Sequence, residues 1–259
     1  MRRLILILLL AGSIFVVAGF VWKSNAAPAV YKPLGPGDTY LALGDSLAAG
    51  FTVSTPDEAY VARIAQALRQ IRPALKVDNM AVAGETSVSF RTFQLPRALA
   101  FIAAEQKAGR RVSPITIDIG GNDARNVERS DRTVRVQAMQ HIGDNLGQAL
   151  DELLRATRDR LGRRTADIVV MNYYNPYGGD PADESSPAYW TAQLNLAIAR
   201  AASARGVPVA DVASAFTGGL AYRYTYITTG DIHANADGHR MIAVQFWKAL
   251  GYPGALAAR

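Results

Sequence analysis

Short apolar runs alternate along the chain with longer segments whose apolar residues recur at helical spacing. The short runs, which we expect to be strands, lie at residues 40–43, 76–82, 115–119, 168–171 and 207–212. The longer segments are typified by Val61, Ile64 and Leu68, which share one face of a helix. This alternation predicts an α/β fold, a three-layer α/β/α sandwich with a central, mostly parallel, five-stranded sheet. Ligands bind beyond the carboxyl ends of the strands in such sheets, so we expect functional residues directly after each run.

The first 26 residues have the pattern of an export signal. Arg2 and Arg3 precede residues 4–22, which carry no charge, and small residues follow at 24–29. The apolar stretch approaches the roughly 20 residues that span a bilayer, so the segment is either a cleaved signal peptide or a retained signal-anchor. The chain would then be secreted, or held outside the cytoplasm by membrane attachment through residues 4–22.

The other segments and the charge complete the organisation of the 259-residue chain. Residues 27–38 contain three prolines and predict a tether, and residues 39–259 predict one domain. Residues 1–26 carry three of the basic side chains, so the net charge falls from +6 to +3 without them. That balance does not favour a nucleic-acid partner. We expect the domain to be a monomer.

The chain has no cysteine, which excludes a thiol nucleophile, a disulfide scaffold and a Cys-based zinc site. A nucleophile must therefore be a hydroxyl, and Ser46 follows the first apolar run within Gly44-Asp45-Ser46-Leu47. A serine at such a strand-to-helix turn can be exposed for attack near a helix N-terminus. The alternative is that Ser46 only caps the helix.

Three further candidate residues lie beside predicted elements. Gly84 follows the second run, where its backbone N–H could face a site, and Asn122 follows the third, where its amide suits a developing oxyanion. Both also fit ordinary turns. His233 precedes the last helix with Asp231 two positions before it, and a neutral histidine is the usual base for serine. His239 is expected to be a surface residue.

In this order the four blocks resemble the SGNH (GDSL) hydrolase family, over about residue 39 to the last helix. The resemblance implies that Ser46 forms an acyl-enzyme and that His233 takes its proton. It also implies an oxyanion hole from the Ser46 and Gly84 backbone N–H groups and the Asn122 side chain. The family's mechanism needs no metal, and we expect no cofactor.

One departure from the family pattern concerns the acid. The family places it three residues before the histidine, where this chain has Gly230. We expect Asp231 to orient His233 instead, although a backbone carbonyl could do so in a Ser–His dyad. After the fourth run, Tyr173, Tyr174 and Asn175 are expected to line a substrate pocket, or else to form a packed turn.

The resulting prediction is an exported serine esterase or lipase. Its ester substrate could be a short-chain acyl ester, a lipid or an acylated glycan. A thioesterase or acyltransferase could use the same site, and a catalytically inactive, membrane-tethered binding domain is the alternative from another class.

Overall fold

The computed structural model describes residues 31–254 and 256. Five strands form one sheet in the order β2-β1-β3-β4-β5, and each neighbouring pair is parallel. The strands are β1 (Thr39–Gly44), β2 (Lys76–Asn79), β3 (Val112–Asp118), β4 (Ile168–Met171) and β5 (Val209–Ala210). The predicted α/β fold with a five-stranded sheet is therefore confirmed.

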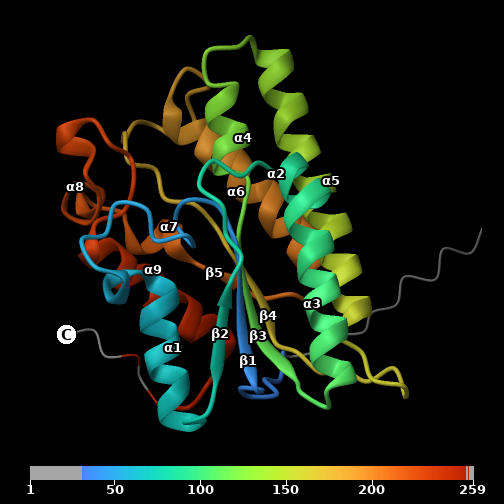
Figure 1. The fold of residues 1–259 in the computed structure, drawn as a ribbon. Coiled ribbons are helices and arrows are strands. Elements are labelled where there is room, and N and C mark those ends of the chain that lie inside the picture. The colour runs from blue at the N-terminus through green and yellow to red at the C-terminus, as the bar shows by residue number, and fades with distance from the viewer. Residues whose placement is uncertain (1–30, 255, 257–259) are drawn as a thin grey trace, which may run out of the picture.

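Helices cover both faces of the sheet, which makes the three layers visible in Figure 1. One layer contains α1 (Tyr60–Ile71) and α9 (Ala236–Leu250), and the other contains α3 (Leu95–Lys107), α5 (Arg132–Ala156) and α6 (Pro187–Ser203). The short helices are α2 (Ser87–Ser89), α4 (Gly121–Asn126), α7 (Val212–Ala215) and α8 (Leu220–Tyr224). Single turns of other helix types span Pro56–Glu58, Phe90–Gln94 and Ile227–Thr229.

The hydrophobic pattern accounts for the central elements. All six residues of β1 are buried, as a strand covered on both faces requires. Although the Met80 and Val82 N–H groups still donate to the Ala42 and Gly44 carbonyl oxygens, strand β2 ends before the predicted residue 82, at Asn79. The Asn79 Nδ2 donates to the Ala48 carbonyl oxygen at 2.7 Å, and its Oδ1 accepts the Ala81 N–H at 3.2 Å. This local turn ends the strand beside the loop that follows β1.

The start of the described chain is fastened to the fold at the amino-terminal side of β4. The buried Asp167 carboxylate accepts hydrogen bonds from the Tyr31 hydroxyl, the Leu34 and Gly35 backbone N–H groups and the Tyr252 hydroxyl. Residues 31–35 are thus held against the end of the sheet opposite the carboxyl ends of the strands.

The expected export signal and the first part of the tether lie outside the described residues. Within the part that the structure describes, no helix has the length and apolarity needed to cross a membrane.

The expectation that His239 lies on the surface is wrong. Its ring is fully buried beneath α1, with Nδ1 accepting the Tyr60 backbone N–H at 3.3 Å. Burial lowers the pKa of His239 from an ordinary value of 6.5 to about 4. The ring is therefore neutral in the folded protein at neutral pH.

Acid should destabilise the fold through His239. An unfolded His239 binds a proton below about pH 6.5, whereas the folded ring resists protonation until about pH 4. The unfolded state therefore binds more protons in this window, and about 3 kcal/mol of unfolding free energy is lost as the pH falls through it. Urea unfolding at pH 4.5 and pH 7 should show a smaller pH difference for His239→Gln than for wild type. The exposed His141→Gln is the matched control, and equal differences in all three proteins would refute the assignment.

Candidate active site

Residues from opposite ends of the chain meet beyond the carboxyl end of β1. The Ser46 hydroxyl lies 2.9 Å from His233 Nε2, although the two residues are 187 positions apart. Ser46 is buried at the turn that follows β1, and His233 is half-buried in the loop before α9. This distance and pairing suit transfer of the serine proton to the imidazole.

Asp231 contacts the other nitrogen of the same ring. Its Oδ1 lies 2.5 Å from His233 Nδ1 and also accepts the His233 backbone N–H at 2.9 Å. One carboxylate oxygen thus holds both the ring and the backbone of His233. Partial burial opposes ionisation of Asp231, but the hydrogen bonds from His233 outweigh it and hold the pKa of this carboxyl below its ordinary value.

A glycine permits this short spacing. Gly230, at the position where the resembled family has its acid, adopts a left-handed φ of 85°. The Asp231 N–H then donates to the Tyr226 carbonyl oxygen, and the Tyr226 N–H donates to the His233 carbonyl oxygen. This tight loop folds Asp231 back onto His233.

Three polar groups follow the ends of β1, β2 and β3: the Ser46 and Gly84 backbone N–H groups and the Asn122 side chain. The Asn122 side chain, in the first turn of α4, donates one Nδ2 hydrogen to the Glu85 carbonyl oxygen at 2.9 Å, which places it next to the Gly84 turn. Gly84 has a left-handed φ of 85°, which favours glycine. Among the described residues, the Ser46 and Gly84 backbone N–H groups donate no hydrogen bond within the protein. Ser46 and Asn122 line the cavity described below, whereas Gly84 is not among its lining residues. The two free N–H groups and the second Nδ2 hydrogen of Asn122 are the donors expected for an oxyanion.

Two buried carboxyls brace the Ser46 turn from below. Asp45 Oδ1 accepts the Leu47 N–H, and its Oδ2 accepts the Tyr173 hydroxyl at 2.7 Å. Asp118, at the end of β3, accepts the Tyr60 hydroxyl at 2.7 Å. Burial and the neighbouring Asp45 raise the pKa of Asp118 well above its ordinary value. The cause is that two adjacent buried carboxyls cannot both ionise at low cost.

A glutamine that sequence reasoning missed joins two of the turns. Gln94 is buried, accepts the Gly44 N–H at 2.7 Å and donates to the Gly44 carbonyl oxygen at 3.0 Å. The same Nε2 donates to Glu85 Oε2 at 2.8 Å. Gln94 thus fixes the end of β1 relative to the Gly84–Glu85 turn. No local motif distinguishes it, because it lies in the helical stretch before Pro96.

A cavity of about 550 Å³ opens above Ser46 and His233. Tyr173 and Tyr174 line it, and the Tyr174 hydroxyl donates to the Ile232 carbonyl oxygen. Asn175 is not among the lining residues. Its Nδ2 donates to the Gly178 carbonyl oxygen within its own turn. Phe51 adds an aromatic ring at 5.0 Å from the His233 ring, with half of its surface exposed.

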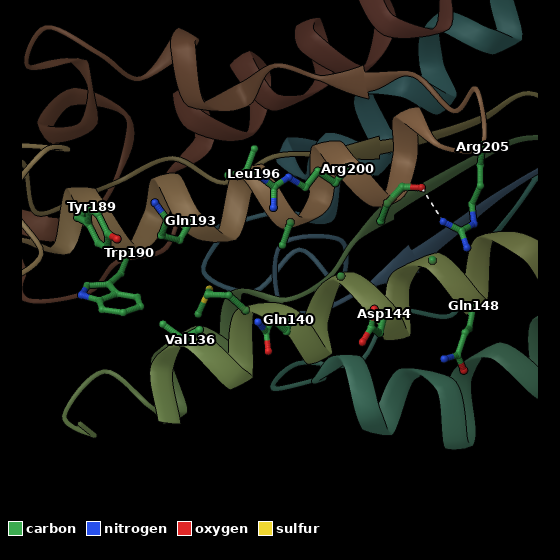
Figure 2. Close-up of a pocket in the computed structure, with 15 residues that line it drawn as sticks. Val136, Gln140, Asp144, Gln148, Tyr189, Trp190, Gln193, Leu196, Arg200 and Arg205 are labelled. Atoms are coloured by element: carbon green, nitrogen blue, oxygen red, sulfur yellow. Dashed lines mark hydrogen bonds between the residues drawn. The ribbon is translucent and has the colours of Figure 1, made fainter. Parts of the chain in front are cut away.

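A second hollow, of about 750 Å³, runs between α5 and α6 (Figure 2). Trp190 and Tyr189 lie at one end of it and Arg205 at the other, where the guanidinium donates to the Ala201 carbonyl oxygen. Neither Ser46 nor His233 lines this hollow, whereas Trp190 lines both. The candidate chemistry therefore belongs to the smaller cavity, and Trp190 lies where the two meet.

The histidines do not suggest a metal centre. His233 points to Ser46, whereas His239 is buried against Tyr60. Across residues 31–254 and 256, no three acidic or histidine side chains gather as a metal site would need.

Comparisons with known proteins agree with this geometry. The model of the GDSL-like lipase/acylhydrolase family matches residues 42–241. A search of the curated proteins found no match.

Solved structures with the same fold include three hydrolases. The lipase Lip_vut3 from a goat rumen metagenome is 21% identical with a TM-score of 0.66, covering 85% of this chain and 99% of its own. The acetyl xylan esterase Axe2 from Geobacillus stearothermophilus is 18% identical with a TM-score of 0.58, covering 84% and 96%. An extracellular lipase from Streptomyces rimosus is 19% identical with a TM-score of 0.52, covering 82% and 99%.

Proposed function

Because the chain belongs to the GDSL-like lipase/acylhydrolase family, we propose that it hydrolyses carboxylic esters through an acyl-enzyme on Ser46. The observation that carries this proposal is the continuous hydrogen-bonded series from Ser46 Oγ to His233 Nε2 and from His233 Nδ1 to Asp231. Such a series activates a hydroxyl that is otherwise a weak nucleophile.

In the first half of the reaction, Ser46 Oγ attacks the ester carbonyl carbon while His233 Nε2 takes the hydroxyl proton. The negative charge moves to the carbonyl oxygen, where the Ser46 and Gly84 N–H groups and the Asn122 amide donate to it. Collapse of this tetrahedral intermediate breaks the bond to the alcohol. The alcohol leaves with the proton that His233 returns, and the acyl group remains on Ser46.

In the second half, His233 Nε2 takes a proton from water, and the resulting hydroxide attacks the acyl carbon. Collapse releases the acid, and the proton returns to Ser46 Oγ. Asp231 accepts the Nδ1 hydrogen throughout, and its lowered pKa keeps it ionised opposite the imidazolium that forms in each half. It is a positioning residue in this proposal.

The pocket supports hydrolysis over a pure binding role. Ser46, His233 and Asp231 are joined, and the cavity above them is open to a small ester. Short-chain acyl esters, lipids and acylated glycans remain the proposed substrates. The similar structures include both lipases and an acetyl xylan esterase.

Export is part of the same proposal, supported by the pattern of residues 1–26. The amino-terminal sequence of protein recovered from the producing cells separates the two forms. A start at Ala27 indicates cleavage, and a start within the first residues indicates a retained anchor.

A fluorophosphonate probe tests the nucleophile directly. The purified full chain should be labelled on Ser46, because the phosphonyl group mimics the tetrahedral acyl intermediate. Ser46→Ala should not be labelled, whereas Ser203→Ala, which changes an exposed serine on α6, should be labelled like wild type. Equal labelling of wild type and Ser46→Ala, or labelling of neither, would refute the proposed function.

A further inference from the structure

The catalytic cavity is walled on one side by cationic side chains. Four charged residues of the segment from α4 to the first turns of α5 line it: Arg125, Glu128, Arg129 and Arg135. Three are arginines and one is acidic, so this wall is positively charged. The mechanism proposed above uses none of them.

Arg135 differs from the arginine one turn before it. Arg132 pairs with the Glu184 carboxylate through two nitrogens, at 2.8 Å and 3.2 Å. Arg135 is half-buried, and among the described residues its guanidinium makes no hydrogen bond or ion pair. Its one close polar contact is with the face of the Trp190 ring, 3.9 Å from the guanidinium carbon to the ring centroid.

This contact leaves the guanidinium edge free. A ring stacked on the flat face of an arginine does not block its five N–H donors, which lie in the guanidinium plane. Trp190 is itself fixed, because it is buried and its Nε1 donates to the Glu184 carbonyl oxygen at 2.7 Å. Arg135 is therefore held in the cavity wall on a rigid support, with unused donors.

Partial desolvation makes such a group receptive to an anion. Burial lowers the pKa of Arg135, and Glu128 only partly opposes this. Among the described residues, no carboxylate lies within 4 Å of the Arg135 guanidinium. An anion that enters the cavity would therefore stabilise its positive charge.

We propose that Arg135, stacked on Trp190, binds an anionic group of the ester substrate, and that the enzyme prefers esters carrying a carboxylate or a phosphate. This inference rests on the proposed function, because Ser46 and Arg135 line the same cavity. It narrows the substrate class to acidic esters, in which the anion lies away from the ester carbonyl and contacts the cavity wall between α5 and α6.

Matched esters test this preference. Butyryl esters of 4-hydroxybenzamide, 4-hydroxybenzoate and 4-hydroxyphenyl phosphate present a neutral, a carboxylate and a phosphate group on similar leaving alcohols. For the wild-type full chain, kcat/KM for at least one anionic ester should exceed that for the neutral ester by about 10- to 100-fold, as expected for a charge-assisted hydrogen bond. The ratio should decrease in 0.5 M NaCl.

Variants test whether Arg135 causes the preference for anionic esters. Arg135→Gln should bring the anionic-to-neutral ratio close to one, and Arg135→Lys should give an intermediate ratio because it retains charge without the planar fork. The ratio is measured on one preparation, so partial unfolding cancels. Arg132→Gln, one turn away and already paired with Glu184, should retain the wild-type ratio.

The outcomes separate this inference from the proposed function. Hydrolysis of the neutral ester with no preference for either anion would overturn the anion site alone. An equal ratio in Arg135→Gln and wild type would also overturn it. Failure of wild type to hydrolyse any of the three esters would overturn both, and the fluorophosphonate experiment reports on the nucleophile independently. A preference for one anion over the other identifies which acidic group the wall accepts.

Discussion

Ser46→Ala and His233→Ala are each expected to lower kcat/KM by about 10⁴- to 10⁶-fold, and the double variant should be no slower than either. The reason is that the two side chains act as one unit. Without the base, the Ser46 hydroxyl is a weak nucleophile, and without the hydroxyl, His233 has no proton to take. Hydrolysis of a single ester by the three variants, measured against buffer, tests this.

A residual rate above buffer should remain in all three. The Ser46 and Gly84 N–H groups and Asn122 are still present and can stabilise an oxyanion formed by direct attack of water. His141→Ala, at an exposed position on α5, is the control and should retain wild-type turnover. Losses that multiply in the double variant would contradict the shared role. So would a Ser46→Ala enzyme with more than a small fraction of wild-type activity.

Much of this site could be predicted from sequence because its parts lie at the ends of strands. Ser46 and Asn122 follow directly after buried runs, and a parallel sheet gathers such positions at one edge. His233 was found by a different signal, a nearby carboxylate before the last helix. These signals come from residues that are close together in the sequence, so they can be read from a single chain.

The supporting residues could not be predicted in the same way. Gln94 contacts Gly44 across 50 positions, and its residue type does not indicate a clamp. Asp118 alternates with the isoleucines of β3, a pattern that suggests a solvent-facing side chain. In a sheet covered on both faces that position is buried instead, which places Asp118 beneath Asp45.

The helical spacing around His239 does indicate that this residue is buried. It precedes Ile242, Ala243 and Phe246 by three, four and seven positions, so it shares the buried face of α9 with them. The residue type suggested the surface, whereas the helical period placed it in the core. The helical period indicates the observed burial, which is possible because a neutral histidine with one hydrogen-bonded nitrogen can be buried.

The spacing between the acid and the histidine differs from the pattern of the resembled family. A carboxylate three positions before the histidine is absent here, and a Ser–His dyad oriented by a backbone carbonyl was the alternative. In the structure, the left-handed Gly230 turns the chain so that Asp231 Oδ1 reaches His233 Nδ1 at 2.5 Å. This distance places the carboxylate within hydrogen-bond reach of the ring nitrogen, as the proposed orienting role requires.

Asp231→Asn is therefore expected to lower kcat by about 10²- to 10⁴-fold with little change in KM. The amide oxygen can still accept the His233 hydrogens, so the loop should fold normally. What is lost is the negative charge opposite the imidazolium, which forms only during the reaction. The exposed Asp237→Asn, on the first turn of α9, is the matched control and should retain wild-type kcat.

The split between kcat and KM separates the lost charge from a structural role, and the pH profile is a second check on the carboxylate. The pKa of Asp231 is held below its ordinary value of 3.8, so the wild-type carboxylate is ionised at neutral pH. The loss in Asp231→Asn should thus persist across the whole range from pH 5 to 9, where the wild-type carboxylate is always charged. A near-normal kcat for Asp231→Asn would instead assign the orientation of His233 to the backbone and make the enzyme a Ser46–His233 dyad.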